Sequence, residues 1–310
     1  MEQFAFLGLD FLPNFFAPRG HQGRETVFEG FRKYYAAKGH HDASPLVQKR
    51  FEVNKKFGIA MDDIAKYDVT VATPLLINSA VAAFWCCYEL YSHPELLSEM
   101  RDGLRATART SPSDNFLHMD VDQVSAKFPK WEAFVREVLR LKAYNLSARA
   151  VLRDTTLEGG YLLKKDSILL IPSAEIHSDP EMWGTAAEEF RPERFLKEGG
   201  IRSGVPASSY RTFGAGPTLC PGRHLFMTEM IVLMAIMVLK YDIQPVGGVW
   251  GEIERQAHML KAILAPARDI EVDMVERDCD EKNRWKFYWA GTELDSALPV
   301  SRPMPSAEKN

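Results

Sequence analysis

The chain has 310 residues, of which 46% are hydrophobic and 26% are charged, and its formal net charge is −4. This balance fits one large or two moderate globular domains and excludes a disordered chain. The small net charge gives no electrostatic argument for nucleic acid binding, so we expect no nucleic acid partner. The four cysteines form no CxxC pair and no regular spacing, which argues against a zinc site or a disulfide framework and favours a reducing compartment.

The first third of the chain is predicted to be helical. Residues 23–66 carry aromatic and aliphatic positions spaced by three and four, which is typical of amphipathic helices. The apolar run 69–90 then approaches the roughly 20 residues that a helix needs to cross a bilayer. Because Asn78, Ser79 and Glu89 interrupt this run, we interpret it as a buried core helix rather than a membrane span.

The next part of the chain changes from helical to strand-like patterns. Amphipathic helices are predicted over residues 94–109 and 129–141, the first of them opened by a proline. Residues 147–172 contain two short runs of strand-forming residues separated by the turn signal Glu158-Gly159-Gly160, which predicts a small sheet. Residues 176–212 lack periodicity and predict a long ordered meander or loop rather than a core element.

A cysteine loop follows the meander and precedes a helix predicted from about residue 224 to 241. Its pattern F-x-x-G-x-x-x-C-x-G is formed by Phe213, Gly216, Cys220 and Gly222. A thiolate at a helix N-terminus is stabilised by the positive end of the helix dipole and by free N–H donors. Glycines let the backbone approach a flat cofactor closely.

This pattern resembles the cysteine loop of the cytochrome P450 family, in which the cysteine ligates the haem iron. Two further motifs occur in the same order: E-x-x-R at Glu137 and Arg140, and the PERF segment at 190–195, which contains Arg194. The resemblance implies that these three charged residues pair and hold the meander beneath the loop. It also implies haem b as the cofactor, with Cys220 as the axial ligand of the iron.

Each motif alone allows a simpler interpretation. Glu137 and Arg140 also fit an ordinary i,i+3 surface pair, and Cys220 also fits a buried thiol. Three motifs in the family's order favour the family over both.

The resemblance covers nearly the whole chain but only the later part of the family's architecture. We therefore expect a mainly α fold with a small β portion, a cytochrome P450 fold that lacks its N-terminal part. One partial domain is expected over residues 1–310. Residues 1–146 would be mostly helical, including the long central helix, and residues 147–310 would hold the small sheet, meander, cysteine loop and final helix.

Finer resemblance points to the branch with sterol 7-alpha-hydroxylases and prostacyclin synthase, and to fungal relatives. Its basis is Asn78, followed six positions later by Phe84-Trp85 and then by His93-Pro94-Glu95. Most monooxygenases of the family carry an acidic residue and a threonine in this helix to deliver protons to bound oxygen, and Ile77 and Asn78 occupy those places here. Asn78 is therefore the predicted catalytic residue; a helix-packing amide is the alternative.

Arg149 stands where this branch places a basic residue that pairs with a haem propionate. A solvated strand arginine is the alternative. Thr218 replaces the basic residue that many family members carry two positions before the cysteine, so Arg149 would carry more of the propionate charge. The resemblance also implies that Leu146, Ser147 and Ala148 line the substrate pocket, and their composition predicts a mainly apolar ligand.

The activity implied by the resemblance is that of a haem-thiolate monooxygenase. Such an enzyme inserts one oxygen atom from O2 into an apolar small molecule, a sterol, lipid or secondary metabolite, with electrons from an NADPH-dependent reductase. A haem-thiolate isomerase or dehydratase acting on a peroxide is the alternative that Ile77 and Asn78 permit. A truncated, non-catalytic fragment is a third possibility, which the missing N-terminal part supports.

Family members usually lie on the endoplasmic reticulum membrane. The apolar N-terminus of this chain lacks the basic region and cleavage site of a signal peptide, and we find no convincing transmembrane anchor in the sequence. A peripheral and a cytoplasmic location therefore stay open.

Overall fold

The computed structural model describes residues 17–111, 113–114, 116–196, 206–254, 262–277, 284–289 and 292–294. The chain forms two compact units, Met1–Ala80 (unit 1) and Val81–Asn310 (unit 2). The boundary between them falls within the long helix α5 (Met61–Tyr91), so one helix contributes to both units.

Unit 1 is helical throughout its described part. It contains α3 (Pro18–Ala36), η2 (Gly39–His41), α4 (Pro45–Lys56) and the first part of α5. Pro18 and Pro45 open α3 and α4, where a missing N–H and a fixed φ suit the first turn. Apolar side chains meet in a small core around Tyr35, Ile64 and Ala65. The amphipathic helices predicted for this part of the chain are confirmed.

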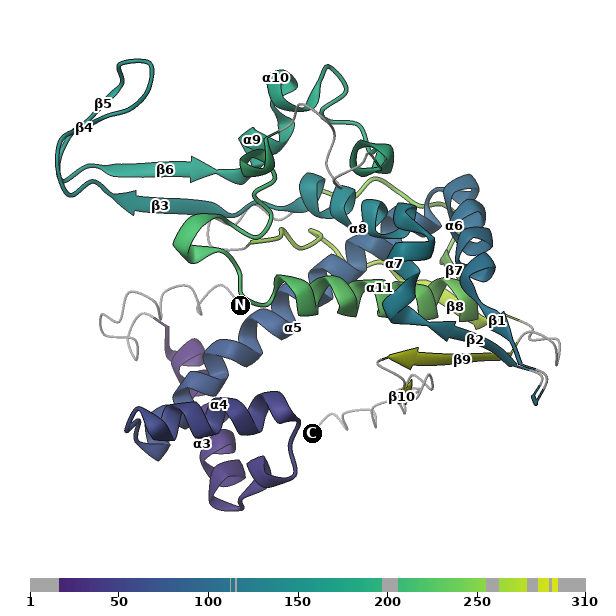
Figure 1. Ribbon diagram of the computed structural model, residues 1–310, viewed down its shortest axis with the longest axis horizontal. Helices are drawn as coiled ribbons and strands as arrows, with labels where there is room; N and C mark the ends of the chain where they lie inside the picture. Colours follow the sequence, from purple (N-terminus) through teal and green to yellow (C-terminus); the bar gives the residue numbers. More distant parts are fainter. Residues whose placement is uncertain are drawn as a thin grey trace, which may run out of the picture. The chain divides into compact units, whose positions relative to one another are not determined.

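The core of unit 2 is built mainly by helices. They are α6 (Pro94–Thr107), α7 (Val124–Lys127), α8 (Pro129–Lys142), α11 (Arg223–Lys240) and the last part of α5. Figure 1 shows α11 beside α8 and α6. The indole N–H of Trp131 on α8 donates to the carbonyl of Ile231 on α11 at 3.1 Å, so a hydrogen bond reinforces the apolar packing between these two helices.

Two antiparallel pairs form an arm of unit 2. β3 (Leu146–Ala150) pairs with β6 (Ile168–Pro172), and β4 (Thr155–Thr156) pairs with β5 (Leu162–Leu163). The turn between β4 and β5 uses Gly159 and Gly160, whose φ angles of +86° and +84° lie in the left-handed region that glycine tolerates. The small sheet predicted from residues 147–172 is confirmed.

The remaining strands join residues that lie far apart in the sequence. One sheet has the order β1 (Arg109–Thr110), β2 (Phe116–Asp120), β9 (Arg284–Trp289), β10 (Thr292–Leu294). A second pair joins β7 (Tyr241–Pro245) to β8 (Val272–Glu276). β2 runs parallel to β9, and the sequence did not predict β1 or β2.

The meander contains more regular structure than its sequence predicts. It includes α9 (Ser173–Ser178), α10 (Pro180–Trp183) and η4 (Pro192–Phe195). Trp183 and Phe195 are buried and pack with Ala133 of α8 in a second apolar cluster of unit 2. The expectation that this segment contributes no core element is therefore wrong, because its aromatic side chains pack against α8.

The prediction that the apolar run 69–90 is a buried core helix holds only for its last part. Trp85, Cys86 and Leu90 are buried, whereas Leu76 is 71% exposed. In the described part of the chain, α5 is the one helix long and apolar enough to cross a membrane, and only 24% of its most apolar stretch is buried. Core helices pass the same test of length and composition, so α5 gives weak support for a membrane span.

Candidate functional site

The cysteine loop is held by its own backbone and by α11. The N–H of Cys220 donates to the carbonyl of Phe213 at 2.9 Å, which closes the loop. Gly214 and Gly216 have φ angles of +75° and +64°, a conformation that a side chain would strain. The Phe213 ring meets the Phe226 ring edge to face at 5.7 Å, so the start of the loop is attached to α11.

Cys220 presents a half-buried thiol just before α11. Gly222 is the N-cap of that helix, and a Cβ atom added there would lie 3.9 Å from the sulfur of Cys220. The glycine therefore leaves the space beside the sulfur open. By contrast, Cys86 is fully buried, and burial raises the pKa of Cys87 to about 12, so these two thiols stay protonated.

The described side chains around Cys220 include no cluster of metal ligands. Within the described ranges, no group of three or more His, Cys, Asp or Glu side chains could hold a metal ion.

Arg149 lies against the cysteine loop. It stands on β3, and its guanidinium donates to the hydroxyl of Thr218 at 2.7 Å and to the carbonyl of Ala148 at 2.8 Å. Among the described residues no carboxylate lies within ion-pair distance of it. The structure thus places a cation beside Thr218, where many family members carry a basic side chain.

The three predicted pocket residues lie on both faces of β3. Side chains alternate along a strand, so Leu146 and Ala148 lie on one face and Ser147 and Arg149 on the other. Leu146 is 41% exposed, and its face of the pair also carries Leu170, which is 54% exposed. That all three residues line a substrate pocket stays a prediction.

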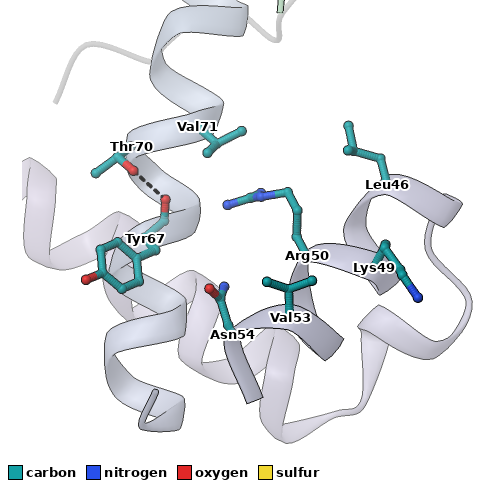
Figure 2. A pocket seen from close by; sticks show the side chains of 8 residues that line it. All are labelled: Leu46, Lys49, Arg50, Val53, Asn54, Tyr67, Thr70 and Val71. Carbon is teal, nitrogen blue, oxygen red and sulfur yellow. Dashed lines mark hydrogen bonds between the residues drawn. The ribbon is translucent and has the colours of Figure 1, made fainter. Parts of the chain in front are cut away.

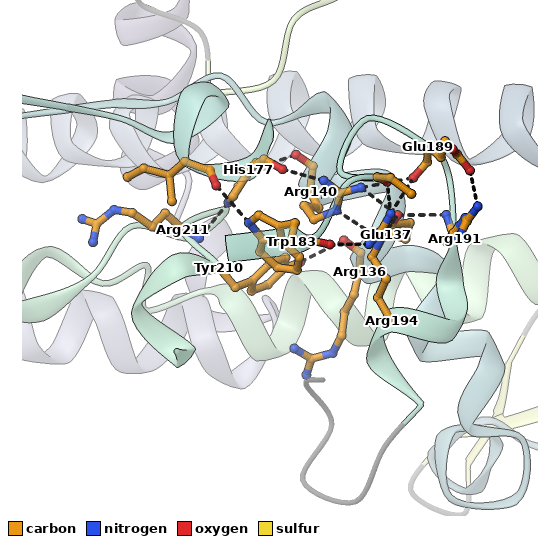
Figure 3. Close-up of polar contacts among 12 residues, drawn as sticks. Arg136, Glu137, Arg140, His177, Trp183, Glu189, Arg191, Arg194, Tyr210 and Arg211 are labelled. Atoms are coloured by element: carbon orange, nitrogen blue, oxygen red, sulfur yellow. Dashed lines mark hydrogen bonds and ion pairs between the residues drawn. The ribbon is translucent and has the colours of Figure 1, made fainter. Parts of the chain in front are cut away.

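The two other motifs meet in a buried ion network (Figure 3). Arg140 pairs with both carboxylate oxygens of Glu137 at 2.7 and 2.8 Å, and neither side chain is exposed. The Nε of Arg194 lies 3.2 Å from the same carboxylate, and its Nη1 donates to the carbonyl of Trp183 at 2.8 Å. One carboxylate thus faces two guanidinium groups, and backbone carbonyls satisfy other guanidinium N–H donors.

His177 belongs to the same network, although nothing in the sequence distinguished this lone histidine of the meander. Its side chain is 2% exposed. The Nδ1 atom lies 2.9 Å from the carbonyl of Arg140, so it carries the proton and donates. The Nε2 atom accepts from the N–H of Arg211 at 2.8 Å. Burial lowers the pKa of His177 from 6.5 to about 4, so this neutral form persists at physiological pH.

Acid is expected to destabilise the fold through His177. Between pH 6.5 and about 4 the unfolded chain binds a proton at this residue and the folded chain does not, so stability falls as the pH falls. The loss should reach about 3 kcal/mol at pH 4, at 1.36 kcal/mol per pKa unit. Urea unfolding at pH 7 and pH 4 measures it, and the His177→Gln variant should lose about 3 kcal/mol less than the wild type. Equal losses of stability in the wild type and the variant would contradict the assignment of His177 as the residue responsible.

A groove in unit 1 is the alternative candidate site (Figure 2). It has a volume of about 390 Å³ and is lined by Leu46, Lys49, Arg50, Val53, Asn54, Tyr67, Thr70 and Val71. Arg50 pairs with Asp68 at 2.8 Å, and Lys49 pairs with Glu52 at 2.8 Å. Both cations are already neutralised, so the groove has no free charge to orient a polar ligand.

Asn78 also belongs to unit 1, on α5. It is half-buried, as is Ile77 beside it. Its placement on a catalytic face stays a prediction.

The residues around the cysteine loop fit a haem group. Haem needs a thiolate ligand, apolar surface against its ring and a cation near its propionates. Cys220 supplies the thiol, and Arg149 supplies the cation. Leu219 and Leu225, on either side of Cys220 in the sequence, are 39% and 40% exposed and supply apolar surface.

The mainly helical fold and the cysteine loop before the long helix α11 fit a haem-thiolate protein. The family model for cytochrome P450 matches residues 77–271, which is more than half of the chain. The chain therefore belongs to the cytochrome P450 family. The predicted resemblance is confirmed, and so is the mainly α fold with a small β portion.

Three relatives show the range of similar proteins. The chain is 32% identical to cytochrome P450 monooxygenase nodJ of Hypoxylon pulicicidum, over 94% of this chain and 58% of that protein. It is 30% identical to the 25-hydroxycholesterol 7-alpha-hydroxylase of Rattus norvegicus, over 65% of this chain and 51% of that protein. It is 32% identical to the bifunctional cytochrome P450/NADPH–P450 reductase ALT2 of Alternaria alternata, over 54% of this chain and 14% of that protein. The chain spans about half the length of the first two.

Proposed function

We propose that this chain is the haem-binding portion of a monooxygenase that inserts one oxygen atom from O2 into an apolar small molecule. The observation that carries the proposal is the half-exposed thiol of Cys220, on a glycine-shaped loop at the start of α11. Haem bound through a thiolate supplies the oxygen activation, because the thiolate pushes electron density that favours O–O cleavage.

The residues of the loop would hold the cofactor in different ways. Cys220 is the proposed axial ligand, and Phe213 fixes the loop to α11 through its ring contact. Gly216 and Gly222, which have no side chain, would let the backbone approach the cofactor closely. Arg149, held at Thr218, would pair with a propionate.

The ion network would support the cysteine loop by holding the meander that precedes it. Glu137, Arg140 and Arg194 join α8 to the meander, which leads directly into the loop. Because these charges are buried, the network is stable only when all three partners are in place. We therefore assign them a structural role in haem retention.

Asn78 is the proposed residue of the catalytic face. An amide has no titratable proton, so Asn78 would orient a water molecule or a substrate hydroxyl by donating and accepting hydrogen bonds. Leu146, Ser147 and Ala148 are the proposed substrate contacts. We propose a sterol, a lipid or a secondary metabolite as the substrate; the name of the rat relative, a 25-hydroxycholesterol 7-alpha-hydroxylase, supports a sterol-like molecule.

An NADPH-dependent reductase is the proposed electron donor. The Alternaria relative is named as a cytochrome P450 that carries such a reductase in the same protein, which supports this partner. For location we propose the endoplasmic reticulum membrane, the usual place of family members. A peripheral or cytoplasmic location is the alternative, since α5 gives only weak support for a span.

An isomerase or dehydratase that acts on a peroxide is the second candidate. The observation that favours it is that α5 offers Ile77 and Asn78 where most monooxygenases of the family have an acid and a threonine. Neither side chain releases a proton, and a peroxide substrate already contains the O–O bond. A chain that does not turn over a substrate is the third candidate.

The two enzymatic proposals differ in the electrons they need. We expect the haem-loaded chain, with a reductase, NADPH and isotope-labelled O2, to convert an apolar sterol or lipid to a product that carries one labelled oxygen atom. Product formation from a lipid hydroperoxide without any electron donor would instead establish the isomerase or dehydratase. Absence of turnover in both assays would support the non-catalytic candidate, and failure to bind haem would overturn both enzymatic proposals.

A further inference from the structure

The backbone of Arg211, just before the cysteine loop, is fixed by hydrogen bonds at both its N–H and its carbonyl. Its N–H donates to Nε2 of His177 at 2.8 Å. Its carbonyl accepts from the side-chain amide of Asn145 at 2.9 Å and from the N–H of Gly214 at 2.9 Å. Because Phe213 lies two residues further on, the position of the Arg211 backbone determines where the loop begins.

The other ring nitrogen of His177, Nδ1, is bonded to α8. Its Nδ1 donates to the carbonyl of Arg140 at 2.9 Å, and the guanidinium of Arg140 donates to the carbonyl of His177 at 2.6 Å. The ring lies 5.9 Å from the Tyr210 ring, nearly parallel to it, and 6.2 Å from the Trp183 ring, at a right angle. Both ring nitrogens are therefore in use, and the aromatic neighbours fix the plane of the ring (Figure 3).

A continuous series of hydrogen bonds and short backbone segments thus leads from the buried ion network to the ligand loop. It runs from Arg140 through His177 to Arg211, along the chain to Phe213, and through the Phe213 carbonyl to the N–H of Cys220 at 2.9 Å. Each step is a directional bond rather than an apolar contact, so a change at His177 would be transmitted as a shift of the loop.

We propose that His177 is a positioning residue that sets the place of the Cys220 sulfur relative to α8. The inference rests on the proposed haem-binding function, since the sulfur is the proposed iron ligand. It assigns separate roles to the two ring nitrogens: Nδ1 attaches the ring to α8, and Nε2 holds the loop. The hydrogen bond between Nε2 and the N–H of Arg211 is the one that determines the position of the Cys220 sulfur.

Two amide variants separate these roles. His177→Gln places an amide oxygen near the Nε2 position, so it can still accept from Arg211. His177→Asn places its amide nitrogen near the Nδ1 position, so it keeps only the bond to Arg140.

His177→Phe keeps the ring between Trp183 and Tyr210 but removes both hydrogen bonds. His118→Phe is the control, because His118 contacts Asp114 and Tyr288 instead.

The first readouts need no haem. We expect the Arg211 amide of the wild type and of His177→Gln to be protected from hydrogen exchange, and that of His177→Asn and His177→Phe to exchange at least tenfold faster. The alkylation rate of Cys220, followed by mass spectrometry of its peptide, should change at least threefold in the same two variants. The control variant should leave both quantities within twofold of the wild type.

The second readouts use the haem-loaded chain. Transfer of haem to an apo-globin should be at least tenfold faster from His177→Asn and His177→Phe than from the wild type and His177→Gln. The reduced carbon monoxide complex of the first two should lose part of its thiolate band. The urea midpoint of each variant is measured alongside, so that variants of equal stability are compared.

Three outcomes would overturn the inference. An Arg211 amide that exchanges in the wild type as fast as an exposed loop amide is the first, and it needs no variant to fold. The second is wild-type Cys220 reactivity and haem release in His177→Asn. The third is a His177→Gln variant that behaves like His177→Phe. If the wild type takes up no haem, the proposed function fails, whereas amide exchange and alkylation still decide the role of His177.

Discussion

Replacement of Cys220 by alanine is expected to abolish the strongly red-shifted Soret band of the haem-loaded, reduced carbon monoxide complex. That band requires a thiolate opposite the bound gas, and no other described cysteine is placed to supply one. Cys86 is fully buried, and the pKa of Cys87 is raised to about 12 by burial. Absorption spectroscopy of the purified variant measures the change, and turnover should be lost with the band.

The matched control is Cys87→Ala. The sulfur of Cys87 lies 3.8 Å from that of Met234 in the helical core of unit 2, so this variant removes a thiol without touching the loop. It should keep the red-shifted band. A Cys220→Ala variant that kept the wild-type band would contradict the assignment of the ligand.

Replacement of Glu137 by alanine is expected to lower the free energy of unfolding by about 3–5 kcal/mol, the usual cost of breaking a buried ion pair. The variant leaves the guanidinium groups of Arg140 and Arg194 without their carboxylate. It also leaves the N–H of Arg191 without the acceptor that Glu137 provides at 2.9 Å. Urea unfolding at neutral pH measures the loss, and haem retention should fall with it.

Glu132→Ala is the control on the same helix. Glu132 pairs with Arg136 at 2.6 Å, but these side chains are 33% and 30% exposed. An exposed pair of this kind contributes at most about 1 kcal/mol. If the two variants lost equal stability, the network of Glu137 would be no more than an ordinary surface pair.

Most of the predictions about the site came from the spacing of residues within the motifs. Cys220 and its glycines need a loop before a helix, and the structure has that loop, with Gly216 in the left-handed region. Glu137 and Arg140 need one face of one helix, which i,i+3 spacing provides. These features depend on residues close in sequence, so their pattern is visible before folding.

Two errors came from assigning burial by composition. The run 69–90 is apolar enough for a core helix, yet Leu76 is 71% exposed while Trp85 is buried. The meander has no periodicity, yet Trp183 and Phe195 pack into a core cluster. Burial depends on what each side chain meets in the folded chain, and hydrophobicity alone does not specify the partner.

Spacing and residue type were therefore sufficient for the longer helices, the paired strands β3 and β6, the cysteine loop and the resemblance to the family. Tertiary folding alone brought Arg149 to Thr218 and made His177 a bridge between Arg140 and Arg211. It also paired β2 with β9, whose residues are more than 150 positions apart. Long-range hydrogen bonds leave no periodic trace in a sequence, because each partner only needs a suitable donor or acceptor when the chain brings it into reach.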